Sequence, residues 1–208
     1  YDIHLLSLSK GDNRAPEYLA VNPMGKVPAL KHGDTVITEG AAICAYLADE
    51  FPRAKLNVPI GTPRRGVYLK WLFFGPSCIE AAMIDRASPR KEEARRAMLG
   101  YGDFDTVIDV LTKAVTKGPY LMGEQFTAAD VIIGSTLRWG TMFKLLPERP
   151  EFATYIGRLA QRPSTTASGS DCTGTCVAHQ MTPHQAVIGA ACGYANECLG
   201  DDGWLTCV

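Results

Sequence analysis

The sequence predicts an α/β unit followed by an all-α unit, and three observations lead to this fold class. Residues 1–56 alternate short strand-like runs with helical ones. Residues 62–163 show only the three- and four-residue spacing of apolar side chains that is typical of amphipathic helices. Residues 164–208 differ from both units, because they are rich in Cys, Gly and Thr and poor in charge. We therefore treat them as an atypical tail that begins with a linker.

The first unit is predicted to start with short elements. Residues 3–8 are apolar and strand-like. Residues 13–20 favour a short turn of helix, which ends before Pro23 because the residue that precedes a proline resists the α conformation. Residues 27–31 and 35–37 are expected to pair as a hairpin around a glycine-containing turn.

Two helices are expected after the hairpin. The first covers the alanine-rich residues 39–49, with Thr38 as its N-cap and Phe51 near its end, where a proline follows. The second opens the all-α unit, where apolar side chains recur at helical spacing over residues 67–74.

The rest of the second unit is predicted to form three more helices. Pro89 favours a helix start, and we expect one long helix over residues 91–118. Residues 130–143 are apolar almost all round, which predicts the buried central helix of the unit. A last helix is predicted over residues 148–162.

The start of the central helix has a recognisable capping pattern. Thr127 is expected to cap the helix, and Asp130 stands three residues later, where the second member of a capping box belongs. Phe126 and Val131 are spaced to pack against each other as a hydrophobic staple. A cap of this kind stabilises a helix by about 1 kcal/mol.

Charge and hydropathy exclude several classes of protein. Acidic residues exceed basic ones by one in the 208-residue chain (22 against 21), so we expect neither a nucleic-acid partner nor attraction to an anionic membrane. No apolar run approaches the roughly 18 residues of a membrane span. The first residues lack the basic and apolar regions of a signal peptide, and we expect a cytoplasmic protein.

The seven cysteines are unevenly placed along the chain. Cys44 and Cys78 lie in apolar helical contexts and are predicted to be buried thiols. The other five fall in the last 45 residues. An odd count and two thiols in a core argue against a secreted disulfide framework.

Two cysteines and two histidines of the tail raise the question of a zinc site. Cys172, Cys176, His179 and His184 could supply four ligands. Zinc fingers separate their two ligand pairs by about a dozen residues, and here the pairs are nearly adjacent, so we expect no metal. Two alternatives are a C-terminus translated from a shifted frame and a weak helix over residues 185–199.

Two motifs together carry a family resemblance. Residues 22–30 read Asn-Pro-Met-Gly-Lys-Val-Pro-Ala-Leu and lead through the hairpin into Ile-Thr-Glu-Gly-Ala-Ala-Ile at 37–43. Residues 120–130 and 158–163 match the start of a central helix and the end of a later one. In this order and spacing, the motifs resemble the glutathione transferases, in a bacterial-like form, over residues 1–163.

The resemblance implies a fold and an activity. The fold would be a partial thioredoxin-like domain over residues 1–56, lacking the first strand and helix, followed by the family's all-α domain over residues 62–163. The activity would be conjugation of the glutathione thiol to small electrophiles, as in detoxification. Glutathione would be a substrate, a small hydrophobic electrophile its acceptor, and the protein a cytoplasmic homodimer.

The resemblance also implies the residues that bind glutathione. Pro28 would be a cis-proline that leaves the N–H and C=O of Val27 free to pair with the extended tripeptide. Glu39 would face the γ-glutamyl amino group, and the N-terminus of the next helix, at Gly40, would face the carboxylate. The family has a hydroxyl residue at position 40, and its absence here lowers the expected affinity. Lys26 would balance the glycyl carboxylate.

Candidates for the acceptor site come from the aromatic residues of the all-α unit, which are Trp71, Phe74, Tyr101 and Trp139. The alternative is that each of them belongs to the core. Arg64 and Arg65 are expected either to reach a dimer partner or to be solvated.

The residue that activates the thiol has no counterpart. In the family it follows the first strand, whereas residues 3–8 match the second strand. Ser7 and Ser9 therefore lie in the wrong element, and the catalytic residue stays unassigned. We expect the chain to be incomplete at its N-terminus. The alternative is a non-catalytic binding or interaction protein on the same fold.

Overall fold

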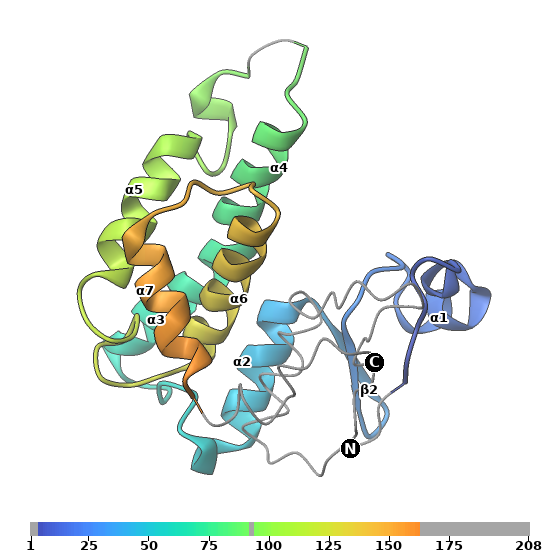
Figure 1. Ribbon diagram of the computed structural model, residues 1–208. Helices are drawn as coiled ribbons and strands as arrows, with labels where there is room; N and C mark the ends of the chain where they lie inside the picture. The colour runs from blue at the N-terminus through green and yellow to red at the C-terminus, as the bar shows by residue number, and fades with distance from the viewer. Residues whose placement is uncertain (1–3, 92–93, 163–208) are drawn as a thin grey trace.

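The computed structural model describes residues 4–91 and 94–162. Figure 1 shows a small N-terminal unit with a two-stranded sheet beside a larger helical unit, with α2 between the hairpin and the helices. The helices and strands, with 3₁₀ and π segments labelled η, are η1 (Asp12–Arg14), α1 (Pro16–Val21), β1 (Ala29–His32), β2 (Thr35–Thr38), α2 (Gly40–Glu50), η2 (Pro52–Ala54), α3 (Pro63–Phe74), η3 (Gly75–Glu80), α4 (Ala81–Ala87), η4 (Arg96–Met98), α5 (Phe104–Val115), α6 (Ala128–Met142) and α7 (Pro150–Ala160).

The predicted hairpin is confirmed, whereas the predicted first strand is wrong. β1 and β2 pair antiparallel, with Ala29 opposite Thr38 and His32 opposite Thr35. Within the described residues of the segment 3–8, that is 4–8, no strand forms. A strand needs a neighbour for its backbone hydrogen bonds, and no described segment pairs with this one.

The helix predicted over 39–49 is confirmed, but its cap is not Thr38. Thr38 is still the last residue of β2, and Glu39 is the N-cap of α2. Glu39 has a φ of 69°, a left-handed value that turns the chain sharply from strand into helix. This turn brings the backbone N–H groups of the first turn of α2 to the end of the hairpin.

A single helical rod runs through α3, η3 and α4. The middle segment η3 is a π-helix, which contains Pro76. A proline inside a helix has no N–H to donate, and a widened turn is one way to accommodate it. Gly75 allows close packing at this point, because a Cβ built there would lie 2.7 Å from Cγ2 of Ile132 on α6.

This rod of 25 residues is also long and apolar enough, by length and composition alone, to cross a membrane, with a mean hydropathy of 1.2 over a window of 18 residues. Charged side chains such as Lys70 and Glu80 interrupt it, so it contains no continuous apolar run of that length. Tyr68, Leu72 and Ile79 nevertheless have at most 1% of their surface exposed, because they lie in the protein core. A core helix needs the same apolar composition as a membrane helix.

The long helix predicted over residues 91–118 is also wrong. Residues 96–98 form only a 3₁₀ turn, and Gly102 follows with a left-handed φ of 79°. Asp103 then caps α5 by accepting a hydrogen bond from the backbone N–H of Thr106 at 2.7 Å. A strong cap directly after a left-handed glycine starts the helix at Phe104.

The capping box at α6 is confirmed, and it extends further than the sequence indicated. The Asp130 carboxylate is fully buried and accepts hydrogen bonds from the N–H and hydroxyl of Thr127 at 2.8 and 3.0 Å. It also accepts from the N–H of Leu121 and the hydroxyl of Tyr155, both at 2.7 Å. Asp130 thus joins α6, α7 and the loop before α6.

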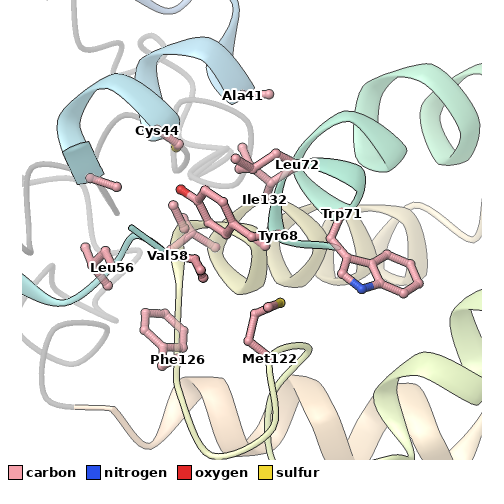
Figure 2. Close-up of a cluster of buried hydrophobic side chains, with 14 of the residues drawn as sticks. Ala41, Cys44, Leu56, Val58, Tyr68, Trp71, Leu72, Met122, Phe126 and Ile132 are labelled. Atoms are coloured by element: carbon pink, nitrogen blue, oxygen red, sulfur yellow. The ribbon is translucent and has the colours of Figure 1, made fainter. Parts of the chain in front are cut away.

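The buried apolar side chains form two cores, and the first of them joins the two units. The first core, drawn in Figure 2, packs α2 against α3 and the start of α6, so it crosses the boundary between the two units. The second core fills the helical unit between α4, α5, α6 and α7. Polar contacts reinforce the boundary: Arg65 donates to both carboxylate oxygens of Asp49, at 3.0 and 2.7 Å, and the N–H of Ala128 donates to the carbonyl of Leu56 at 2.8 Å.

The close packing of α6 predicts a pair of contrasting glycine substitutions. A Cβ on Gly140 would lie 2.6 to 2.7 Å from buried atoms of Leu146 and Met83, so Gly140→Ala should lower the free energy of unfolding by about 1–3 kcal/mol. Gly157 on α7 has open space around it, and Gly157→Ala should stabilise the fold by about 0.5–1 kcal/mol. Urea denaturation of both variants measures the difference. Equal stabilities would contradict the packing described for α6.

Candidate glutathione site

Hydrogen bonds from the side chains of Asn13, Tyr18 and Asn22 hold the loop 22–28 in place. The Tyr18 hydroxyl and the Asn22 side-chain amide both donate to the carbonyl of Lys26, at 2.6 and 2.7 Å. The Asn13 amide donates to the carbonyl of Gly25 at 2.8 Å. Burial, partly opposed by the hydrogen bond with Asn22, raises the pKa of Tyr18, which therefore remains a donor at neutral pH.

Gly25 lets this loop turn tightly. Its φ is 60°, and a Cβ there would lie 2.8 Å from the carbonyl oxygen of Asn13 and from a guanidinium nitrogen of Arg14. Both the left-handed backbone and the close approach require glycine. This explains why glycine stands at this position in the motif.

The peptide bond between Val27 and Pro28 is cis, as predicted. Pro28 is buried and Val27 is half-buried at the start of β1. Within residues 4–91 and 94–162, neither the N–H nor the C=O of Val27 forms a hydrogen bond. These two groups are therefore available to pair with an extended peptide.

The N-terminus of α2 lies at the end of the same hairpin. The Glu39 side chain is exposed, and its carbonyl accepts the first hydrogen bond of the helix, from Ile43 at 2.9 Å. The N–H groups that open a helix have no partner within it and face the positive end of its dipole, which suits a carboxylate. Gly40 is buried and supplies only its backbone donor.

Lys26 is exposed at the edge of this site. In the part of the chain that the structure describes, its ammonium group forms neither a hydrogen bond nor an ion pair. Its predicted contact with a glycyl carboxylate stays a prediction.

A cavity of about 560 Å³ opens on the helical unit beside η3 and α4. One wall carries Pro76, Glu80 and Ile84, and the other comes from the segment before α5 and includes Met98 and Tyr101. The cavity is wide open to solvent and partly apolar, with a few polar groups on its walls.

Asp85 organises the polar part of the cavity. It accepts hydrogen bonds from the hydroxyl of Tyr101 at 2.6 Å and from the guanidinium of Arg90 at 2.7 Å. These two bonds, that of Tyr101 first, lower the pKa of Asp85. Arg90 is the one cation among the cavity-lining residues, and Asp85 already pairs with it.

Of the four aromatic candidates for the acceptor site, the structure brings Tyr101 to this cavity. Trp71 is only 6% exposed and lies in the first core, with Phe74 against its edge. Trp139 packs on the second core beside Phe143. Arg64 and Arg65 bind the carbonyl of Met122 and the carboxylate of Asp49 within the same chain.

Sequence reasoning missed Glu80 as a residue of the cavity wall. Glu80 lines the cavity and is half-buried. Burial, and then the negative charge of Glu39, raises the pKa of Glu80. The signal in the sequence was one acid inside the apolar run Ser-Cys-Ile-Glu-Ala-Ala.

Comparison with known proteins identifies the family. The chain matches the model of the glutathione S-transferase N-terminal domain over residues 1–50 and that of the C-terminal domain over residues 72–163. Glutathione S-transferase GstA of Escherichia coli O157:H7 is 31% identical over 164 residues, which cover 78% of this chain and 79% of that protein. The chain belongs to the glutathione S-transferase family.

Solved structures of this family agree with the fold. A glutathione transferase of Methylococcus capsulatus is 32% identical, with a TM-score of 0.62 over 74% of this chain and 77% of that one. A glutathione transferase of Phanerochaete chrysosporium, solved with oxidized glutathione, is 29% identical, with a TM-score of 0.64 over 80% and 82% of the two chains. The predicted fold class, a partial thioredoxin-like domain followed by an all-α domain, is confirmed.

The expectation that the protein holds no metal ion applies to the described residues and to the tail. Within residues 4–91 and 94–162, no group of three or more His, Cys, Asp or Glu side chains is arranged to hold a metal ion. The four tail residues weighed as zinc ligands lie outside the described residues.

Proposed function

We propose that this family member joins the thiol of glutathione to small electrophiles. The observation that carries the proposal is that the backbone N–H and C=O of Val27, the residue before the cis-proline, have no hydrogen-bond partner among the described residues. These groups lie on the hairpin segment that leads into the N-terminus of α2. The tripeptide would lie extended along Val27, with its γ-glutamyl end at Glu39 and Gly40. Lys26 would face the glycyl carboxylate. The relatives named above, all glutathione transferases, support this reading.

The electrophile would occupy the cavity beside η3 and α4. Ile84 and Met98 supply apolar surface, and Tyr101 and Asp85 supply polar groups. This lining suits a small, mainly apolar molecule with one or two polar substituents.

We further propose that the protein forms a homodimer through the rod α3–η3–α4. Val67 and Phe73, on the α3 part of this rod, are 46% and 60% exposed, which is high for large apolar side chains. A second copy of the chain would remove this surface from water. Sedimentation should give the mass of two chains, and a monomer at micromolar concentration would contradict this proposal.

The conjugation reaction tests the proposed function directly. The protein should bind to immobilised glutathione, elute with free glutathione, and convert a chromogenic electrophile faster than the uncatalysed reaction. Binding without conjugation would favour the alternative of a non-catalytic binding protein. Failure of both would overturn the assignment of the site.

A further inference from the structure

The cavity beside η3 and α4 has a carboxylate on its wall that no described residue binds. Glu80, the last residue of η3, lines this cavity and is half-buried. To the residues of 4–91 and 94–162, its carboxylate makes no hydrogen bond and no ion pair. Ser77 precedes it on the same wall, but the hydroxyl of Ser77 donates to the carbonyl of Phe73 at 2.5 Å. That hydroxyl therefore does not bind Glu80.

The charges on the cavity wall do not cancel. Arg90 donates to both carboxylate oxygens of Asp85, at 3.0 and 2.7 Å, and the hydroxyl of Tyr101 donates to Asp85 at 2.6 Å. Since Arg90 is the one cation among the cavity-lining residues, this pairing leaves the negative charge of Glu80 uncompensated. Burial, and then the negative charge of Glu39, raises the pKa of Glu80. A positive charge brought by a ligand would stabilise the ionised carboxylate.

The same cavity presents apolar surface to solvent. Ile84 lies one turn after Glu80 on the rod and is 53% exposed, and Met98 of the other wall is 78% exposed. A ligand in the cavity would remove part of this apolar surface from water, which is favourable. The cavity thus combines apolar side chains with one uncompensated negative charge.

We propose that this cavity prefers electrophiles that carry a positively charged group, and that Glu80 sets the preference. The apolar body of such a molecule would lie on Ile84 and Met98, with its cation at the carboxylate of Glu80. The inference rests on the proposed function, because it takes this cavity as the site of the electrophile. It narrows the polar substituent of the electrophile to a cationic one, and it predicts that an anionic substituent is disfavoured.

The test measures binding of unreactive probes, so it does not depend on conjugation. Three 4-hydroxybenzyl compounds differ only in the group on the benzylic carbon, which is trimethylammonium, tert-butyl or sulfonate. The first two groups have nearly the same shape and differ in charge. Chemical-shift titration of the amides of Ile84, Gly100 and Tyr101, which line the cavity, gives the three dissociation constants for wild type and for Glu80→Gln.

The expected result is a change in the ratio of affinities. The affinity for the cation relative to that for the tert-butyl probe should fall by about three- to tenfold in Glu80→Gln, because one charge pair in a partly solvated site is lost. The relative affinity for the sulfonate should rise. A change of packing in the variant would affect the two isosteric probes alike and cancel in their ratio. Equal ratios in the two proteins, or a cation that shifts none of these amides, would overturn the role of Glu80.

Glu50→Gln is the matched control. Glu50 is exposed at the C-terminal end of α2 and does not line the cavity, so this variant removes the same charge and should keep the wild-type ratio. A change in the ratio as large as that of Glu80→Gln would assign the effect to the overall charge of the protein and overturn the inference.

Conjugation separates this inference from the proposed function. Three α,β-unsaturated ketones carry the same three groups far from the reacting carbon; the glutathione sulfur bonds to the β-carbon, and the thiol proton ends on the α-carbon. Each rate is divided by that of the uncatalysed reaction. Preferential binding of the cationic probe without conjugation of any ketone would support the charge preference and overturn the proposed function. Conjugation of all three ketones with the same relative rates in wild type and Glu80→Gln would overturn this inference alone.

Discussion

Replacing Asp130 with alanine is expected to lower the free energy of unfolding by about 3–5 kcal/mol. The carboxylate is fully buried and accepts four hydrogen bonds, from Leu121, Thr127 and Tyr155. Losing a helix cap alone costs about 1–2 kcal/mol. The larger figure follows because the backbone N–H of Leu121 and the hydroxyl of Tyr155 would also lose their acceptor in the protein interior.

Chemical denaturation measures this effect against a matched control. Asp105 stands in the first turn of α5, as Asp130 does in α6, but its side chain is exposed. Asp105→Ala should therefore change the stability by about 0.5 kcal/mol or less. If the free energy of unfolding of Asp130→Ala differed from that of wild type by less than about 1 kcal/mol, the hydrogen bonds of Asp130 could not be what links α6, α7 and the preceding loop.

Replacing Glu39 with alanine is expected to weaken glutathione binding by about ten- to a hundredfold. The proposed contact joins an ammonium group to a carboxylate, and a charge-assisted hydrogen bond of this kind is worth about 1.5–3 kcal/mol. Glu39 already adopts its left-handed φ of 69° as a non-glycine residue, so alanine can take the same backbone. The loss should therefore appear in affinity and not in stability.

Glu39→Gln is the informative companion variant. Glutamine keeps the shape and one oxygen acceptor but removes the charge, so calorimetry should give an affinity between those of wild type and Glu39→Ala. An affinity for Glu39→Ala that equals wild type would show that the γ-glutamyl group binds elsewhere. A lower unfolding temperature in both variants would instead indicate a structural role at the start of α2.

The parts of the fold that the sequence predicted correctly have local signals. The hairpin, the capping box at Thr127 and Asp130, and the loop that enters Pro28 each depend on residues within about ten positions of one another. The helix predicted over 91–118 was wrong because two glycines and the cap at Asp103 outweighed the helical pattern around them.

The site was only half predictable, for a physical reason. Val27, Glu39 and Gly40 lie in one continuous segment, and a motif can describe them. The cavity wall that contributes Tyr101 forms only because the segment before α5 lies against η3 and α4. No spacing in the sequence encodes that contact.

The most direct test of the assigned site is an amide chemical-shift titration of the isotopically labelled protein with reduced glutathione. The N–H of Val27 and the first amides of α2, at Gly40 and Ala41, should shift together and saturate with one dissociation constant. Glu39→Ala should raise that constant without moving the starting positions of amides in the second core. Saturable binding that leaves Val27 and Gly40 unshifted, or no binding at millimolar glutathione, would contradict the glutathione site described for this chain.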